Sequence, residues 1–180
     1  MERNITLIAL FAALTAALGL VPKIDLLSGV PITAQSLGIM LCGTVLGKRN
    51  GVLSVLLFLL LAMVGLPILS GGRGGFGVFL GPTAGFLIGF PFAAFVAGLV
   101  VEKWRAPVGL AAFAGAILGG IVVLYAFGIA GMAITLGKSL GEAALLSLPF
   151  LPGDLIKAAL AGLVTHSLFQ MRPAVVMSRM

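Results

Sequence analysis

Two ionisable side chains of opposite charge, Asp154 and Lys157, lie in an otherwise apolar stretch near the carboxyl end of the chain. Residues three apart share one face of a helix, so the carboxylate and the ammonium group are expected to lie side by side. Inserting an ionisable side chain into a bilayer costs about 2.5–3.5 kcal/mol at a helix centre, and less near the ends. The pair therefore either recognises a polar ligand or acts as an ion pair that steadies the helix start. We favour ligand recognition.

A glycine-rich stretch over 65–89 is the second candidate for chemistry. Five glycines fall within 71–77, and Arg73 is the only charge among them. This glycine density is incompatible with a helix, so the backbone is expected to be irregular there. Irregular backbone next to apolar segments is tolerated in a membrane protein when it packs against protein or lines a cavity. The stretch predicts a lid or floor for a small ligand; the alternative is a flexible external connection.

Three uncharged polar residues are expected at the same depth in the membrane as the charged pair. Gln35 can both donate and accept hydrogen bonds, and Thr33 and Thr83 lie near the starts of apolar segments. Each of them could instead be a helix cap or an interhelical hydrogen bond.

The composition is that of an integral membrane protein. The 180 residues are 61% hydrophobic and 9% charged, and the mean hydropathy is +1.25. Such values are typical of several membrane spans in one domain, here taken as residues 1–180. The net charge of +6 is scattered between the spans, so a nucleic-acid partner is not expected, and the bilayer is. A single cysteine, Cys42, and a single histidine, His166, leave little for a metal site or a disulfide framework.

The hydrophobic pattern predicts an all-α protein with six membrane spans, each needing roughly 20 apolar residues. The predicted spans cover residues 5–21, 32–46, 52–64, 82–101, 107–129 and 152–171. A polar turn is expected at 47–51, and Pro82 is expected as the first residue of the fourth helix. The segment 131–151 is expected to be a connection with a short surface helix near 141–148. The glycine-rich stretch then joins the third and fourth spans and covers an outward-facing pocket.

The basic residues indicate the orientation of these spans. Seven fall on one side and three on the other, so both termini are predicted to be cytoplasmic in a multi-pass protein of the cell membrane. The seven are Arg3, Lys48, Arg49, Lys103, Arg105, Arg172 and Arg179, and the three are Lys23, Arg73 and Lys138.

Enzymatic activity is not expected. Residues 72–77 match a dinucleotide-binding glycine pattern, but no soluble βαβ unit surrounds them. The segment 131–139 ends like a phosphate-binding loop with the wrong spacing, so ATP hydrolysis by this chain is not expected. No nucleophile lies within predicted reach of a base. A self-sufficient secondary carrier is disfavoured because the charged pair lies near one end of its helix, away from the midplane.

The motifs resemble the BioY family, the biotin-binding membrane subunits of energy-coupling factor transporters. The matching stretches are V-P-I-T-A-Q at 30–35, the glycine-rich residues 65–77, G-P-T-A-G-F at 81–86 and D-L-I-K at 154–157. The resemblance implies a six-helix fold, biotin capture from outside, and docking on a transmembrane coupling subunit that works with two ATPase subunits. No cofactor is implied, since ATP is used by the partner subunits. The family often has glycine and tyrosine where this chain has Ala84 and Phe86.

The resemblance also implies roles for particular side chains. Biotin requires polar groups for its ureido ring, an apolar wall for its thioether ring and a cation for its carboxylate. Asp154 with Lys157, the Phe76 and Phe86 rings, and Arg73 could supply these, although the basic residue that binds the carboxylate stays open. The expected substrate-binding residues are Asp154, Lys157, Arg73, Gln35, Thr33, Gly74, Gly75, Phe76, Thr83 and Phe86. The small residues Ala9, Ala13 and Ala17, four apart on one helix face, are the expected docking surface for the coupling subunit.

Overall fold

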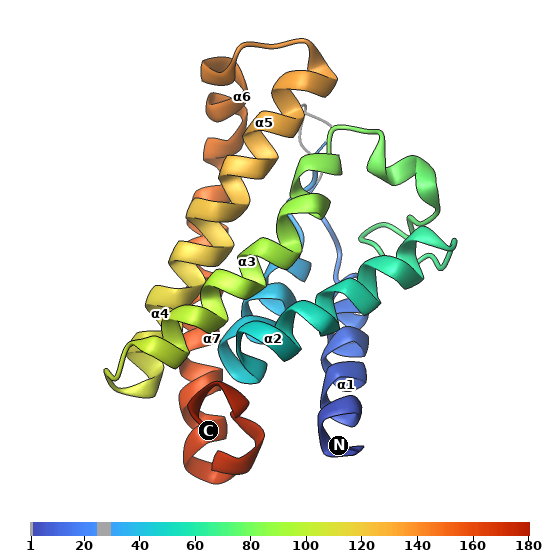
Figure 1. The fold of residues 1–180 in the computed structure, drawn as a ribbon. Coiled ribbons are helices and arrows are strands. Elements are labelled where there is room, and N and C mark those ends of the chain that lie inside the picture. Colours follow the sequence, from blue (N-terminus) through green and yellow to red (C-terminus); the bar gives the residue numbers. More distant parts are fainter. Residues whose placement is uncertain (1, 25–29) are drawn as a thin grey trace.

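The computed structural model describes residues 2–24 and 30–180, and within them the chain is mainly helical (Figure 1). Residues 25–29 of the predicted first connection lie outside the described residues. The longer helices are α1 (Glu2–Leu18), α2 (Gln35–Met63), α3 (Ala84–Lys103), α4 (Val108–Ile117), α5 (Leu124–Leu136), α6 (Leu140–Ser147) and α7 (Leu151–Met171). The short elements are η1 (Phe76–Phe79), η2 (Leu118–Val123), η3 (Leu148–Phe150), η4 (Pro173–Val175) and η5 (Met177–Arg179).

The length and apolar character of the helices confirm an all-α membrane protein. Among the described residues, four helical stretches are long and apolar enough to cross a bilayer. They cover Gln35–Met63, Ala84–Lys103, Val108–Leu136 and Leu140–Met171. The six separate helices of the sequence prediction are therefore not reproduced one for one.

Helix α2 contains both the second and the third predicted span. Its backbone leaves the helical conformation only at Gly47, where φ is +82°, a value that glycine adopts readily. Glu102 of α3 stabilises the restart: its carboxylate accepts from the Lys48 amide at 2.8 Å and pairs with the Lys48 ammonium group at 2.8 Å. The predicted polar turn at 47–51 is thus a sharp corner, and helix resumes at once after it.

The later helices follow the predicted spans with shifted ends. Pro82 lies two residues before α3, so its prediction as the first helical residue was wrong. Helices α4 and α5 are joined through η2, a π-helical segment, and continue to Leu136, so the start of the predicted connection at 131–151 is helical. The predicted short surface helix is α6, which begins with a capping box between Ser139 and Glu142.

Different segments of the chain lie at the two ends of the molecule. Both chain termini lie at one end, while α6 and the glycine-rich loop (residues 64–83, between α2 and α3) lie at the other (Figure 1). At the terminal end, η5 folds back on the bundle. The Ser178 hydroxyl donates to the Thr44 carbonyl, and the Arg179 guanidinium donates to the Ala106 carbonyl at 2.8 Å. The closely spaced helices between these ends position the polar groups described next.

Candidate functional site: a polar network at the wall of an apolar cavity

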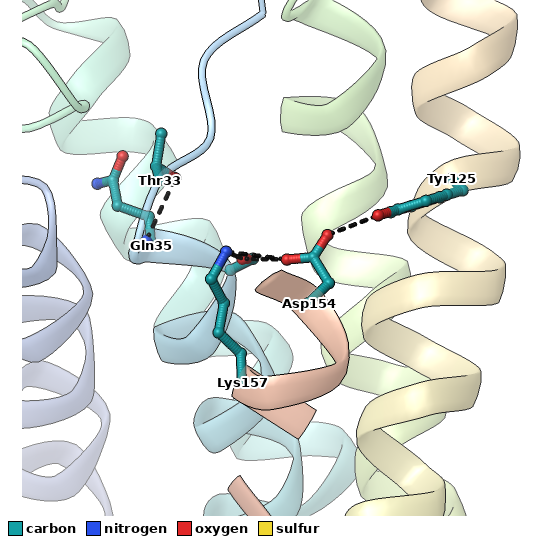
Figure 2. A network of polar contacts seen from close by, with 6 residues as sticks. Thr33, Gln35, Tyr125, Asp154 and Lys157 are labelled. Carbon is teal, nitrogen blue, oxygen red and sulfur yellow. Dashed lines mark hydrogen bonds and ion pairs between the residues drawn. The ribbon is translucent and has the colours of Figure 1, made fainter. Parts of the chain in front are cut away.

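Asp154 is the centre of a hydrogen-bond network that joins three helices (Figure 2). It lies in the first turn of α7 and is 5% exposed. Its Oδ1 atom accepts from Lys157 Nζ at 2.9 Å and from Ser36 Oγ of α2 at 3.1 Å. Its Oδ2 atom accepts from the Tyr125 hydroxyl of α5 at 2.8 Å. The predicted pairing of Asp154 with Lys157 is present, with additional partners from α2 and α5.

This ion pair is largely withdrawn from solvent. The side chains of Lys157 and Asp154 are 14% and 7% exposed. Lys157 Nζ also donates to Ser36 Oγ at 3.0 Å, so the ammonium group, the hydroxyl and the carboxylate form a closed cycle. Removing two charges from water is costly, and good geometry with additional hydrogen bonds compensates for that cost. The cycle explains how the pair is tolerated inside the bundle.

The network forms part of the wall of a cavity between α2, α3, α5, α7 and the two loops that precede α2 and α3. The cavity has about 650 Å³ of empty space when its open mouth is included. Its charged lining residues, within the described chain, are Arg73, Asp154 and Lys157. The other lining residues are Val30, Pro31, Ile32, Thr33, Gln35, Ser36, Leu69, Thr83, Phe86, Leu87, Phe90, Leu124 and Phe150. The site is therefore mainly apolar, with a few convergent polar groups, which is typical of a small-molecule site.

Aromatic rings form one side of the cavity. Phe86 of α3 and Phe150 of η3 meet edge to face, with ring centroids 5.9 Å apart. Tyr125 lies edge-on to both rings, with its centroid 6.5 Å from each. The sequence resemblance noted phenylalanine at position 86 where the family often has tyrosine, and the Tyr125 ring lies next to that ring from another helix.

Arg73 reaches the cavity from the glycine-rich loop. Its backbone pairs with that of Leu69 in an isolated antiparallel bridge, which closes a tight turn. Its Nε donates to the Ser70 carbonyl at 3.1 Å, holding the guanidinium group against the loop. The loop thus carries a positive charge to the cavity wall.

Gln35 lines the cavity, but its amide is already engaged with protein groups. The Nε2 atom donates to the carbonyls of Thr15 and Ile68 at 3.2 and 3.0 Å. The Oε1 atom accepts from the Ser70 amide at 2.9 Å. Thr33 and Thr83 also line the cavity, and the Thr33 hydroxyl accepts from the backbone N–H of Gln35 at 3.3 Å. Gln35 therefore ties α1, α2 and the glycine-rich loop together.

Three predicted ligand residues of the loop lie outside the cavity lining. A Cβ atom on Gly74 would overlap the Leu66 carbonyl oxygen, and the Gly75 amide donates to the Ala62 carbonyl at 2.7 Å. Phe76, in η1, is 62% exposed. In this structure the two glycines fold the loop back onto the end of α2, and Phe150 lines the cavity beside Phe86.

Sequence reasoning missed Tyr125, Ser36 and Phe150. A usable signal existed for Tyr125, because it is the only tyrosine in the chain and lies within an apolar segment. A buried phenol normally requires a hydrogen-bond partner. Ser36 directly follows Gln35, so a second polar group at that level could also have been inferred. Phe150 carries no such signal, since phenylalanine is common throughout the chain.

The predicted docking surface on α1 lies apart from the cavity. Ala9, Ala13 and Ala17 are exposed, whereas Leu7, Phe11, Ala12 and Thr15 on the opposite side of the helix are buried. Helix α1 packs mainly against α2 through the buried side. The alanine stripe consequently faces outward from the described bundle.

Comparison with known proteins places this fold among the substrate-binding components of membrane transporters. The structure is similar to the crystal structure of the S-component for biotin from an ECF-type ABC transporter, with a TM-score of 0.89 and 32% identity. That match covers 94% of this chain and 92% of that chain. The BioY family model matches residues 2–174, and the chain belongs to the BioY family.

Curated relatives agree with this assignment. The chain is 54% identical to the biotin transporter BioY of Rhodobacter capsulatus, over 99% of this chain and 100% of the relative. It is 52% identical to the biotin transporter BioY of Rhizobium etli, over 90% of each chain. Members of this family are transporter subunits without enzymatic activity.

Proposed function

We propose that this chain binds biotin with high affinity and supports its uptake as the substrate-specific subunit of an energy-coupling factor transporter. One observation carries the proposal: among the described residues, the Asp154–Lys157 pair and Arg73 are the charged groups of a mainly apolar cavity. The polar and apolar groups of biotin match those of the cavity, since biotin has a polar ureido ring, an apolar thioether ring and a carboxylate at the end of an aliphatic chain. The similarity to biotin transporters over nearly the whole chain supports the same ligand.

Each part of biotin has a complementary group at the cavity wall. The Asp154 carboxylate accepts from a ureido N–H, and the Lys157 ammonium group donates to the ureido oxygen. Phe86 and Phe150 pack against the thioether ring. Arg73 binds the carboxylate, because the Lys157 donor left by Asp154 and Ser36 goes to the ureido oxygen, whereas the described contacts of the Arg73 side chain occupy only Nε. This arrangement makes Thr33 and Thr83 secondary contacts and Gln35 a support for the loop.

The membrane arrangement has six crossings in a single domain of residues 1–180. They are α1, the two limbs of α2 on either side of Gly47, α3, the α4–η2–α5 rod, and α7. Both termini are cytoplasmic, and the glycine-rich loop faces outside and covers the pocket. The excess of basic residues at the terminal end supports this orientation. Biotin therefore enters from outside the cell.

Transport requires partners that this chain does not contain. The exposed stripe of Ala9, Ala13 and Ala17 docks on the transmembrane coupling subunit, because small side chains let helices approach closely in lipid. Two ATPase subunits supply the energy. The chain needs no cofactor of its own, and nucleic acid plays no part.

Two measurements on the detergent-purified protein test the proposal. Mass spectrometry of small molecules released by denaturation should find biotin, and calorimetry on the ligand-free protein should show saturable biotin binding. Lipoic acid, which has a sulfur ring and an aliphatic acid but no urea, should bind far more weakly. Folded protein that neither releases nor binds biotin would overturn the proposal.

A further inference from the structure

We infer that Tyr125 and Ser36 are positioning residues that orient the Asp154 carboxylate and leave one acceptor and one donor for the edge of a cyclic urea. The inference rests on the proposed function and concerns how the same site selects its ligand. Tyr125 acts through Asp154: within the described chain, Asp154 lines the cavity and Tyr125 does not.

Both oxygens of the carboxylate are held from opposite sides. Tyr125 of α5 donates to Oδ2, while Ser36 of α2 and Lys157 of α7 donate to Oδ1 (Figure 2). A carboxylate held at a single oxygen can still turn about its Cβ–Cγ bond. Donors on both oxygens from different helices fix the plane of the group, so its remaining lone pair has a defined direction.

The Tyr125 ring is itself well anchored. It is packed edge-on against Phe86 and Phe150, with interplanar angles of 80° and 82°. Edge-to-face contacts of this kind hold aromatic rings in a preferred geometry. The Tyr125 hydroxyl is therefore held in a fixed position. The two rings that hold it, Phe86 and Phe150, form part of the cavity wall.

Counting donors and acceptors gives the chemical class of the ligand. A carboxylate offers about four lone-pair sites, and three are occupied by Ser36, Lys157 and Tyr125. An ammonium group has three N–H donors, and two of those on Lys157 go to Asp154 and Ser36. Counting the contacts of the described residues, one acceptor on Asp154 and one donor on Lys157 remain, which complements the adjacent N–H and C=O of a cyclic urea or lactam.

Calorimetric titration of the full-length protein with biotin tests this role. Tyr125→Phe removes only the hydroxyl and keeps the ring, and it should weaken biotin binding about tenfold, the lower range for a hydrogen bond to a charged group. Ser36→Ala should also weaken binding, since it removes one of the two donors on Oδ1. The matched control is Thr135→Val, which removes a hydroxyl from an exposed position of α5, where it bonds only within its own helix. The control should bind biotin with unchanged affinity.

Two further measurements distinguish orientation of Asp154 by Tyr125 from direct contact between Tyr125 and the ligand, and from a general distortion of the cavity. On an Asp154→Asn background, Tyr125→Phe should cause less than a twofold additional change, because the group it orients has been altered. Desthiobiotin keeps the urea and lacks the thioether ring, so Tyr125→Phe should weaken it by the same factor as biotin. A cavity distortion would change the two ligands by different factors.

The outcomes distinguish this inference from the proposed function. Biotin binding by the unmodified protein, combined with unchanged affinity in Tyr125→Phe and Ser36→Ala, would overturn the inference and leave the function standing. A tenfold loss that persists undiminished on the Asp154→Asn background would also overturn it, since Tyr125 would then contact the ligand directly. An unmodified protein that does not bind biotin would overturn both. Should Tyr125→Phe fail to fold, Ser36→Ala tests the same orientation from the other oxygen.

Discussion

The side-chain amide of Gln35 accepts a 2.9 Å hydrogen bond from the Ser70 backbone and so fastens the glycine-rich loop to the start of α2. The same amide donates to the carbonyls of Thr15 and Ile68. One side chain thus holds α1, α2 and the loop in fixed relation around the cavity mouth. Its effect on ligand binding should pass through the position of the loop.

Replacing Gln35 with methionine should therefore destabilise the protein. The change leaves the Ser70 amide and two carbonyls unpaired, at about 1–3 kcal/mol for each buried polar group that loses its partner. Thermal unfolding in detergent should show a clear drop in midpoint, accompanied by weaker biotin binding. Gln170→Met, at an exposed position of α7, is the matched control and should change stability by less than about 0.5 kcal/mol. Lost affinity with an unchanged midpoint would instead indicate direct ligand contact by Gln35.

The double change Asp154→Asn with Lys157→Met should leave a folded protein that has lost its ligand. Removing both partners of a buried pair is often neutral or stabilising, whereas removing one leaves an uncompensated charge. Each lost hydrogen bond to a charged group is worth roughly 1.5–3 kcal/mol, so the dissociation constant should rise about a hundredfold or more. Calorimetry on the folded double mutant measures this. Affinity within threefold of the parent would show that the pair only braces α7.

Leucine at positions 9 and 13 should block coupling without affecting the pocket. The larger side chains prevent close approach of a partner helix to the exposed stripe on α1. Purified double mutant should bind biotin normally, while cells that carry it should fail to take up biotin and the coupling subunit should not co-purify. Ala126→Leu with Ala130→Leu, exposed and equally spaced on α5, is the matched control and should transport normally. Equal loss of transport in both variants would remove the case for α1 as the docking helix.

Cysteine labelling should place the two ends of the molecule on opposite sides of the membrane. Cys42 is the only cysteine and is 0% exposed, so Cys42→Ser provides the background. Phe76→Cys, in the glycine-rich loop, should react with an impermeant thiol reagent in intact cells if the loop faces outside, as proposed. Met180→Cys, 68% exposed at the terminal end, should react only after lysis. The opposite pattern would reverse the orientation.

The parts of the fold that sequence could predict are those governed by periodicity and composition. Long apolar runs located α3, α7 and most of the α4–α5 rod, and the spacing of Asp154 and Lys157 predicted their pairing. The path of the glycine-rich loop has no periodic signal in the sequence. Glycines with positive φ, such as Gly75, allow several backbone paths of similar local free energy. Gly74 and Gly75 were therefore expected at the ligand and lie against α2.

Tyr125 was missed for a different physical reason. It follows the π-helical segment η2, where each turn holds more residues than an α-helical turn. One extra residue rotates the following helix face by about 100°. An uninterrupted helical pattern over 107–129 therefore assigns the wrong faces after residue 123, and only the structure shows that Tyr125 turns toward Asp154.

The folded-back carboxyl-terminal segment has a consequence for biogenesis. Val176 is fully buried, and Ser178 bonds to the Thr44 carbonyl, beside the corner of α2. Residues 176–178 therefore complete the packing around a residue made more than a hundred positions earlier. The bundle cannot reach its final packing until residues 176–178 have left the ribosome, because they form part of that packing. The helices made earlier have this end open until then, so the arrival of residues 176–178 is the step that permits closure there.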